Sequence, residues 1–247
     1  GLHPTKGLYE AAEVQWWWAR ERPTDDLGQL FWFDGQGRPT AAVIITDWRE
    51  WVSLDVIVLP DADRDWVAQV VERGLGHAVE SGFEKVQLEI DRVDEVLRGV
   101  VIGHGFKIEE PEELVESWMP ADARPDISVL PDGYRLATRS KTRERPHHMS
   151  ERMGPTVEQR LKQTSLYRAD LDLLVLDSDG HLAASGLFWF DPKTATGVVE
   201  PMRTEDQHQQ RGLARHVLTA GVDLLVKAGA ERIKICYESD NPASGHL

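Results

Sequence analysis

The sequence has little cysteine, no long hydrophobic run and fewer basic than acidic residues. Its one cysteine, Cys236, cannot form an internal disulfide or, by itself, a cysteine-based metal site. No apolar run approaches the ~20 residues that a membrane-spanning helix needs. The first ten residues also lack the apolar core of a signal peptide. We therefore expect a cytoplasmic protein with no membrane partner.

The deficit of basic residues is large. There are 28 Lys and Arg against 42 Asp and Glu, which gives a formal net charge of −14. Binding to a phosphate backbone needs clustered Lys and Arg, so the charge argues against nucleic acid as the main partner. The 41% of hydrophobic residues is enough for a packed core, and 247 residues suit one large or two small domains.

Two pairs of segments resemble one another along the chain. LFWFDGQGRPTAAVII (30–45) matches LLVLDSDGHLAASGLF (173–188) at an offset of 143, and both are typical of a β-hairpin. SGFEKVQLEI (81–90) matches AGAERIKICY (228–237) at an offset of 147, and both are typical of a glycine-terminated helix followed by a buried strand. Because the offsets differ by only a loop-sized four residues, we interpret the chain as a tandem duplication.

The stretch 120–133, PADARPDISVLPDG, has the composition of a linker. The predicted domains are therefore residues 1–120 and 121–247. Strands are expected at 29–33, 41–47, 54–59, 85–90, 135–138, 171–177, 182–190, 197–202 and 232–237, and helices at 64–80, 94–103 and 211–227. This order predicts an α/β (α+β) fold, in which each domain has a mixed, mostly antiparallel sheet flanked by helices.

The segment 197–218, GVVEPMRTEDQHQQRGLARHVL, carries the clearest functional signal. An apolar strand leads through a polar turn into an amphipathic helix. The first turn of a helix leaves backbone N–H groups without partners, and the helix dipole adds positive charge there. Gly212 has no side chain and Ala214 almost none, so a bulky anion such as a diphosphate can approach the main chain.

The order strand, turn, Gln209-x-x-Gly212-x-Ala214, helix resembles the acyl-CoA signature of the GNAT acyltransferases, Arg/Gln-x-x-Gly-x-Gly/Ala. Asn241-Pro242-Ala243 is similar to the Asn-x-x-Ala that begins the family's next helix. The resemblance implies two GNAT-like domains and acetyl-CoA as cofactor, with its pantetheine arm beside the strand that ends at 200–204. The residues implied to contact coenzyme A are Met202, Arg203, Thr204, Gln209, Gln210, Arg211, Gly212, Leu213, Ala214, Arg215 and Asn241.

The first domain contains a similar tetrapeptide, Arg73-Gly74-Leu75-Gly76. The offset of 147 instead aligns Gly212 with Asp65, so both glycines are expected inside a helix. At the aligned loop lie Asp61, Asp63 and Asp65, whose charges would repel a diphosphate. We therefore expect a degenerate first domain that binds no coenzyme A.

Transfer of an acyl group to an amine requires a base and donors for the developing negative charge. Glu200, at the end of the splayed strand, is the predicted base, although some GNAT enzymes carry their Glu slightly earlier on this strand. The family's general acid is a tyrosine in the helix after Asn-x-x-Ala. The chain ends at Leu247, before that tyrosine and the last strands, so we expect an incomplete second domain and name no acid.

His147 and His148 lie in a charged stretch with no Cys and no Asp or Glu at ligand spacing, so no metal site is predicted and a solvated loop or first helix is favoured. The family resemblance leaves open that they touch the substrate. The tryptophan run 16–18 is interpreted as core or interface rather than pocket.

The sequence thus predicts an acetyl-CoA-dependent N-acetyltransferase acting on a primary amine of a small molecule. The acidic composition favours a cationic acceptor such as a polyamine, an aminoglycoside or an amino sugar. The alternative is a non-catalytic acyl-CoA-binding or regulatory protein with the same fold. The oligomeric state stays open, with a homodimer as one option.

Overall fold

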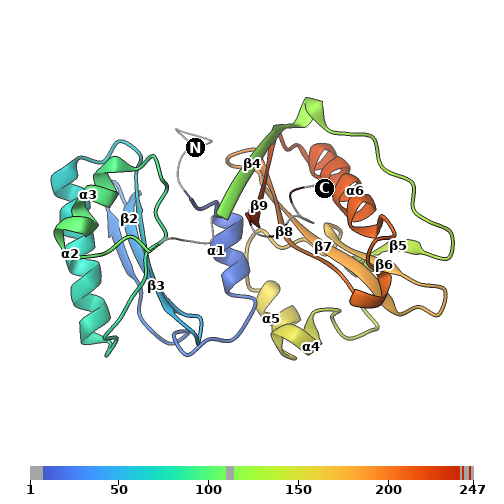
Figure 1. Ribbon diagram of the computed structural model, residues 1–247, viewed down its shortest axis with the longest axis horizontal. Coiled ribbons are helices and arrows are strands. Elements are labelled where there is room, and N and C mark those ends of the chain that lie inside the picture. The colour runs from blue at the N-terminus through green and yellow to red at the C-terminus, as the bar shows by residue number, and fades with distance from the viewer. Residues whose placement is uncertain (1–7, 110–113, 240, 242–244, 246–247) are drawn as a thin grey trace. The chain divides into compact units, whose positions relative to one another are not determined.

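The computed structural model describes residues 8–109, 114–239, 241 and 245. Its internal contacts divide the chain into two units, each of which is described by itself (Figure 1). The N-terminal unit is mainly Glu21–Glu110, and the C-terminal unit combines Tyr9–Arg20 with Pro111–Leu247. None of the helices in the described ranges is long and apolar enough to cross a lipid bilayer.

The division between units differs from the predicted boundary at residue 120. Helix α1 (Ala11–Trp17) packs on strands of the C-terminal unit, and β4 (Leu114–Pro120) pairs with its strand β9. The prediction followed the order of the chain, whereas strand pairing and the burial of α1 place both elements in the other unit. The predicted domains, residues 1–120 and 121–247, therefore differ from the two units in that α1 and β4 both belong to the C-terminal unit.

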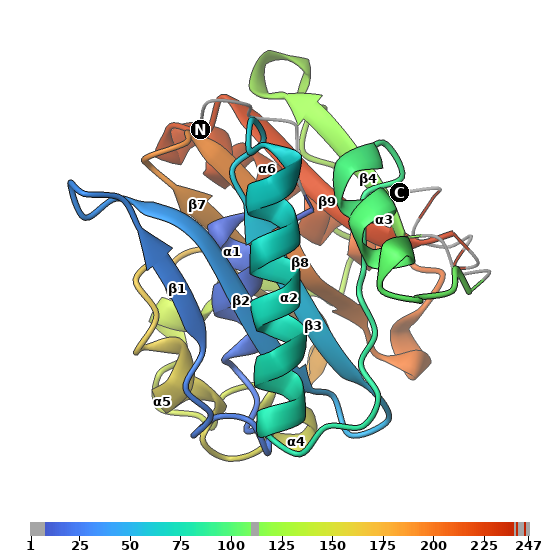
Figure 2. The same ribbon diagram turned by 90° about the vertical axis from the view of Figure 1, so that its left-hand side faces the viewer.

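The N-terminal unit has, in its described part, a three-stranded antiparallel sheet in the order β1-β2-β3. Its elements are β1 (Leu30–Phe33), β2 (Pro39–Asp47), β3 (Val52–Val58), α2 (Arg64–Glu80) and α3 (Glu95–Gly103). Figure 2 shows α2 lying across this sheet. Gly74 of α2 approaches Val43 of β2 so closely that a Cβ would lie 3.1 Å from both γ-methyl groups. Gly74 and Gly76 are therefore helix-interior residues, as predicted.

The strand predicted at 85–90 is not formed. Only Gln87 bridges to β3, in parallel with Ser53, through backbone hydrogen bonds of 2.8 Å with Val52 and Leu54. The apolar pattern predicted a full strand here, whereas the structure pairs one residue of it. Strand β4, which follows it in the chain, pairs instead in the C-terminal unit.

The C-terminal unit has, among the described residues, a six-stranded sheet in the order β4-β9-β8-β7-β6-β5. The strands are β5 (Arg135–Thr138), β6 (Asp172–Leu176), β7 (Leu182–Asp191), β8 (Thr196–Thr204) and β9 (Arg232–Glu238). The pairs are antiparallel except for β8 with β9, which is parallel. Its helices are α1, α4 (Ser150–Met153), α5 (Val157–Leu161) and α6 (Leu213–Ala228), with 3-10 turns at Ala121–Ala123, Arg139–Lys141 and Asp206–His208.

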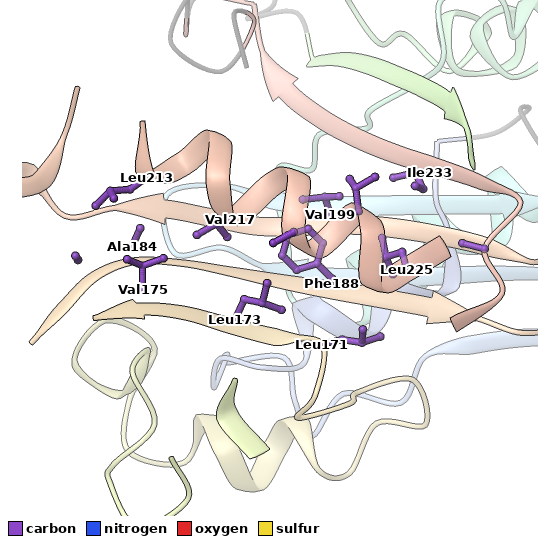
Figure 3. Packing of buried hydrophobic residues seen from close by; sticks show 14 residues of the cluster. Leu171, Leu173, Val175, Ala184, Phe188, Val199, Leu213, Val217, Leu225 and Ile233 are labelled. Atoms are coloured by element: carbon purple, nitrogen blue, oxygen red, sulfur yellow. The ribbon is translucent and has the colours of Figure 1, made fainter. Parts of the chain in front are cut away.

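Two hydrophobic clusters hold this sheet. In Figure 3, Leu213, Val217 and Leu225 of α6 point onto the sheet around Phe188 and Val199. A second cluster gathers residues in or next to α1, α4 and α5 with residues of β7 and β8, namely Ala12, Ala19, Met149, Val157, Leu161, Leu187, Trp189 and Val198. Both sides of the central strands are thus buried, which explains why they are apolar throughout.

The two predicted hairpins share one turn geometry. Asp34 accepts hydrogen bonds from the amides of Gln36 and Arg38, and Asp177 accepts them from the amides of Asp179 and His181. Gly37 and Gly180 follow with φ of +77° and +85°. This match is what a duplication predicts, although the tandem arrangement itself stays a prediction.

The closest approach between α6 and the sheet predicts a large effect of one methyl group. A Cβ on Gly221 would lie 2.0 Å from the ring of Phe188, so Gly221→Ala should lower the free energy of unfolding by at least about 1–3 kcal/mol. The matched control is Gly76→Ala in α2, where the nearest atom is the Arg73 guanidinium at 3.7 Å and Ala is the better helix former. Urea unfolding measures both, and equal stabilities would contradict the packing described here.

Candidate functional site

The strands β8 and β9 part at the centre of the C-terminal sheet. Their parallel pairing runs from Thr196 with Arg232 to Val199 with Ile235 and then ends, although β8 continues to Thr204 and β9 to Glu238. The β8 backbone after Val199 therefore has no partner strand on its β9 side within the described sheet. Unpaired N–H and C=O groups along one side of a strand can bind an extended ligand.

A bulge lies where the strands part. Gly186 pairs with Met202 and Phe188 with Val199, so Glu200 and Pro201 stand opposite the single residue Leu187. The indole nitrogen of the buried Trp189 donates to the Glu200 carbonyl at 2.7 Å. This hydrogen bond fixes the backbone of the bulge and, with it, the position of Glu200.

The loop after β8 ends at the first turn of α6. Gln210 and Gly212 have φ of +59° and +77°, and a Cβ on Gly212 would meet no atom within 4 Å. No side chain of the described structure caps the helix at Gly212, whereas Leu213 is only 1% exposed and anchors the turn. The first amides of α6 thus face open space, which is the arrangement that binds phosphate at a helix start.

The equivalent helix in the N-terminal unit begins differently. Asp63 precedes α2, and its carboxylate accepts a 2.8 Å hydrogen bond from the amide of Trp66. The carboxylate therefore occupies the place where a phosphate would bind, and its charge opposes a second anion. This cap supports the prediction that the N-terminal unit binds no coenzyme A.

Polar side chains fix the loop between β8 and α6. The Tyr134 hydroxyl lies 2.9 Å from Nδ1 of His208, and Arg211 donates to the same hydroxyl at 3.0 Å. Arg203 lies 3.5 Å from Asp206, and Gln209 donates to Asp206 at 3.3 Å. Tyr134 is a contact that the sequence did not reveal.

The structure brings most of the predicted cofactor residues together along β8, the loop and the start of α6. The side chains of Gln209, Gln210, Arg211 and Arg215 are exposed, and that of Ala214 is half-buried. Met202 and Leu213 instead pack against the α6-side core, so only their backbone groups remain to bind a ligand. Thr204 has a buried hydroxyl without a hydrogen-bond partner among the described residues.

The other predicted segment is described only in part. Asn241 is exposed and its amide donates to the Glu238 carbonyl at 3.0 Å. Pro242 and Ala243 lie outside the described residues. The roles assigned to the cofactor residues therefore remain predictions.

Burial and two charged neighbours determine the electrostatic environment of Glu200. Burial, and after it the charge of Glu13, raise the pKa of its carboxyl group, the charge of Lys234 opposes both, and the net result is a pKa of about 7. A carboxyl group that titrates near neutral pH suits a general base. Sequence reasoning missed Glu13 and Lys234, and the only signal was a lysine within the apolar strand IKIC.

The prediction of a solvated segment at His147 and His148 is wrong. His147 is 3% exposed, and both imidazoles approach the fully buried Asp172, at 3.0 Å from His147 and 3.5 Å from His148. Tyr167 donates to the same carboxylate at 2.9 Å. The sequence hid this cluster because Asp172 lies on β6, far from the histidines in the chain.

His147, His148 and Asp172 offer possible ligand atoms that lie within 4.8 Å of one another, as in a metal site. However, the amide of Met149 donates to Nδ1 of His147 at 3.3 Å, which leaves the proton on Nε2 to be donated to Asp172. That tautomer has no lone pair on the nitrogen that faces the carboxylate. The geometry therefore favours a buried hydrogen-bond network over a ligand set.

The buried network predicts how stability depends on pH. Burial lowers the pKa of His148 from 6.5 to about 4, with the nearby His147, Arg139 and Arg152 acting in the same direction and Asp172 against it. Below pH 6.5 His148 is therefore protonated in the unfolded chain but not in the folded chain. The free energy of unfolding should fall by roughly 3 kcal/mol as the pH drops from 6.5 toward 4.

Urea unfolding between pH 7 and pH 4 tests this effect, because His148→Leu should lose that part of the slope. The matched control is His181→Leu in the exposed β6–β7 turn, which should keep the slope of the unmodified protein. Equal slopes in both variants would contradict the assignment.

Comparison with known proteins agrees with this geometry. Residues 130–247 match a family model described as the acetyltransferase (GNAT) family. None of the curated proteins matches the chain. Among solved structures, a GCN5-related N-acetyltransferase from Sphaerobacter thermophilus has 20% identity and a TM-score of 0.61, over 94% of this chain and 78% of that one.

Two further solved structures are similar to this chain. A tandem GNAT protein from the clavulanic acid biosynthesis pathway has 12% identity and a TM-score of 0.61, over 85% of this chain and 74% of that one. A GCN5-related N-acetyltransferase from Kribbella flavida has 13% identity and a TM-score of 0.54, over 92% and 83%. The chain thus contains a domain with the fold of the GNAT acetyltransferases.

Proposed function

We propose that the protein is an acetyl-CoA-dependent N-acetyltransferase whose active site lies in the C-terminal unit. The observation that carries the proposal is the parting of β8 and β9 beside an uncapped helix start. A coenzyme A molecule has an extended pantetheine arm and a diphosphate. The free side of β8 provides a position for the arm, and the uncapped start of α6 provides one for the diphosphate. Acetyl-CoA, when bound, supplies an activated acetyl thioester.

The residues present fit this cofactor. The open space at Gly212 leaves room for a diphosphate against the first amides of α6, where the helix dipole favours negative charge. The free side of β8 leaves backbone groups for the amides of the arm, and the unpartnered hydroxyl of Thr204 is a further donor or acceptor. Arg203, Arg211 and Arg215 add positive charge around the loop.

The proposed base acts on the acceptor. A protonated amine has no lone pair for attack, and Glu200 with a pKa of about 7 can take its proton directly or through water. The largely buried position of Glu200 strengthens its interaction with a cationic amine. We propose a primary amine of a small molecule as the acceptor, which the net charge of −14 favours.

The cofactor site is tested by filling the space at Gly212. Gly212→Trp should weaken coenzyme A binding at least about tenfold, or 1.4 kcal/mol, because the indole occupies the place of the diphosphate. Isothermal titration calorimetry measures the affinity. The matched control is Gly37→Trp, which has the same φ of +77° and the same open surroundings but lies in the N-terminal unit. Undiminished affinity in Gly212→Trp would overturn the site.

The base is tested by removing its charge. Glu200→Gln should lower kcat/KM for amine acetylation by about 10²–10⁴-fold, with coenzyme A affinity retained. The unmodified protein should lose activity about tenfold per unit below pH 7, because the base is then protonated, and the variant should lack this dependence. The release of thiol with a panel of amines measures both. Coenzyme A binding without turnover by the unmodified protein would instead favour a non-catalytic acyl-CoA-binding protein.

A further inference from the structure

A buried ion pair lies on the α1 side of the C-terminal sheet. Lys234 is 0% exposed, and its ammonium group lies 3.0 Å from Oε2 of Glu13 and 2.7 Å from Oε1 of Glu116. Burial opposes the charge on Lys234, yet its acidic neighbours together raise its pKa. Buried charges of this kind are costly in an interior unless each is well partnered.

The register of the strands places this pair beside Glu200. Lys234 stands opposite Val198, so these two side chains lie on one side of the sheet, and Glu200 begins the bulge two residues after Val198. Cys236, two residues after Lys234, approaches Oε1 of Glu13 at 3.5 Å. Glu13 thus lies over the point where β8 and β9 part.

Helix α1 holds Glu13 in this place. The helix packs on β7 and β8, and Ala12 beside Glu13 is buried in the same cluster as Trp189 and Val198. The amide of Glu10 donates to Oε2 of Glu13 at 2.6 Å, so the carboxylate is fixed by its own helix as well as by Lys234. The N-terminal segment therefore places the fixed carboxylate of Glu13 in the C-terminal unit.

The titratable groups around the Glu13–Lys234 pair come from three elements. They are Glu10 and Glu13 of the α1 segment, Glu116 of β4, and Lys234 and Cys236 of β9, while Asp191 and Arg232 act on Glu10. Burial raises the pKa of the Cys236 thiol well above its ordinary value, so it stays neutral. Glu13 and Lys234 remain as the charges that act on Glu200.

We propose that the buried Glu13–Lys234 pair is a positioning element that acts on Glu200 from the α1 side of the sheet, so that α1 belongs to the machinery of the C-terminal unit. The inference rests on the proposed function, because it concerns the proposed base. The negative charge of Glu13 disfavours ionised Glu200, and the positive charge of Lys234 limits the effect. The balance holds the carboxyl group where it can both take and release a proton near pH 7.

The test compares two isosteric variants. Glu13→Gln keeps the shape of the side chain but removes its charge, so the apparent pKa in the kcat/KM profile should fall by roughly one unit. The matched control is Glu116→Gln, which also removes a carboxylate from Lys234 but does not act on Glu200. Its profile should be unchanged. An unshifted profile in Glu13→Gln, or equal shifts in both variants, would overturn the proposal.

A measurement without turnover separates this inference from the proposed function. The ¹³C resonance of the Glu200 carboxyl group can be titrated by NMR in the full chain, where Glu13→Gln should again lower its midpoint. Lys234→Met should raise it, which provides a second variant with the opposite sign. If the full chain lacks transferase activity but both variants shift the Glu200 midpoint, the proposed function is wrong and the charge coupling stands. If neither variant shifts the midpoint, the charge coupling is wrong, whether or not the protein is active.

Discussion

The parting of β8 from β9 is the constraint on which the rest of the site depends. A parallel pair that continued beyond Val199 and Ile235 would satisfy the backbone of both strands and leave no side for an extended ligand. The bulge at Glu200 and Pro201 turns β8 away, and the indole of Trp189 holds that bulge from within the core. The position of Glu200, the free side of β8 and the direction of the loop toward α6 all follow from this one break in pairing.

The two units show how the same element order can be given different chemistry. In each, a hairpin with an Asp-capped turn leads to a further strand and then a long helix. In one, Asp63 satisfies the first amides of α2, whereas in the other Gly212 leaves those of α6 open. The two helix starts thus differ in one respect, a side-chain cap that is present at α2 and absent at α6 among the described residues.

Much of the fold could be predicted from the sequence, because it depends on local patterns. The predicted helix at 211–227 is observed at Leu213–Ala228, since its apolar spacing and the glycines at both ends are local signals. The prediction of a strand at 85–90 was wrong because pairing depends on which strands lie beside a segment, and β4 pairs in the other unit.

The candidate site was predictable only where one short segment carries it. The loop from Gln209 to Ala214 and the proposed base Glu200 lie within fifteen residues, so their arrangement follows from one strand–turn–helix unit. Glu13 and Tyr134 reach the candidate site from distant segments, as Asp172 reaches His147 and His148, and no spacing in the sequence reveals these contacts. Long-range pairing of buried charges is therefore what the sequence did not reveal.

Backbone hydrogen exchange with and without coenzyme A tests the central claim most directly. If the open side of β8 and the uncapped start of α6 bind the cofactor, amides within 200–204 and 210–215 should exchange more slowly when coenzyme A is added. Amides at the Asp63-capped start of α2 should be unaffected. Protection confined to α2, or no protection at β8 and α6 at saturating coenzyme A, would contradict the account.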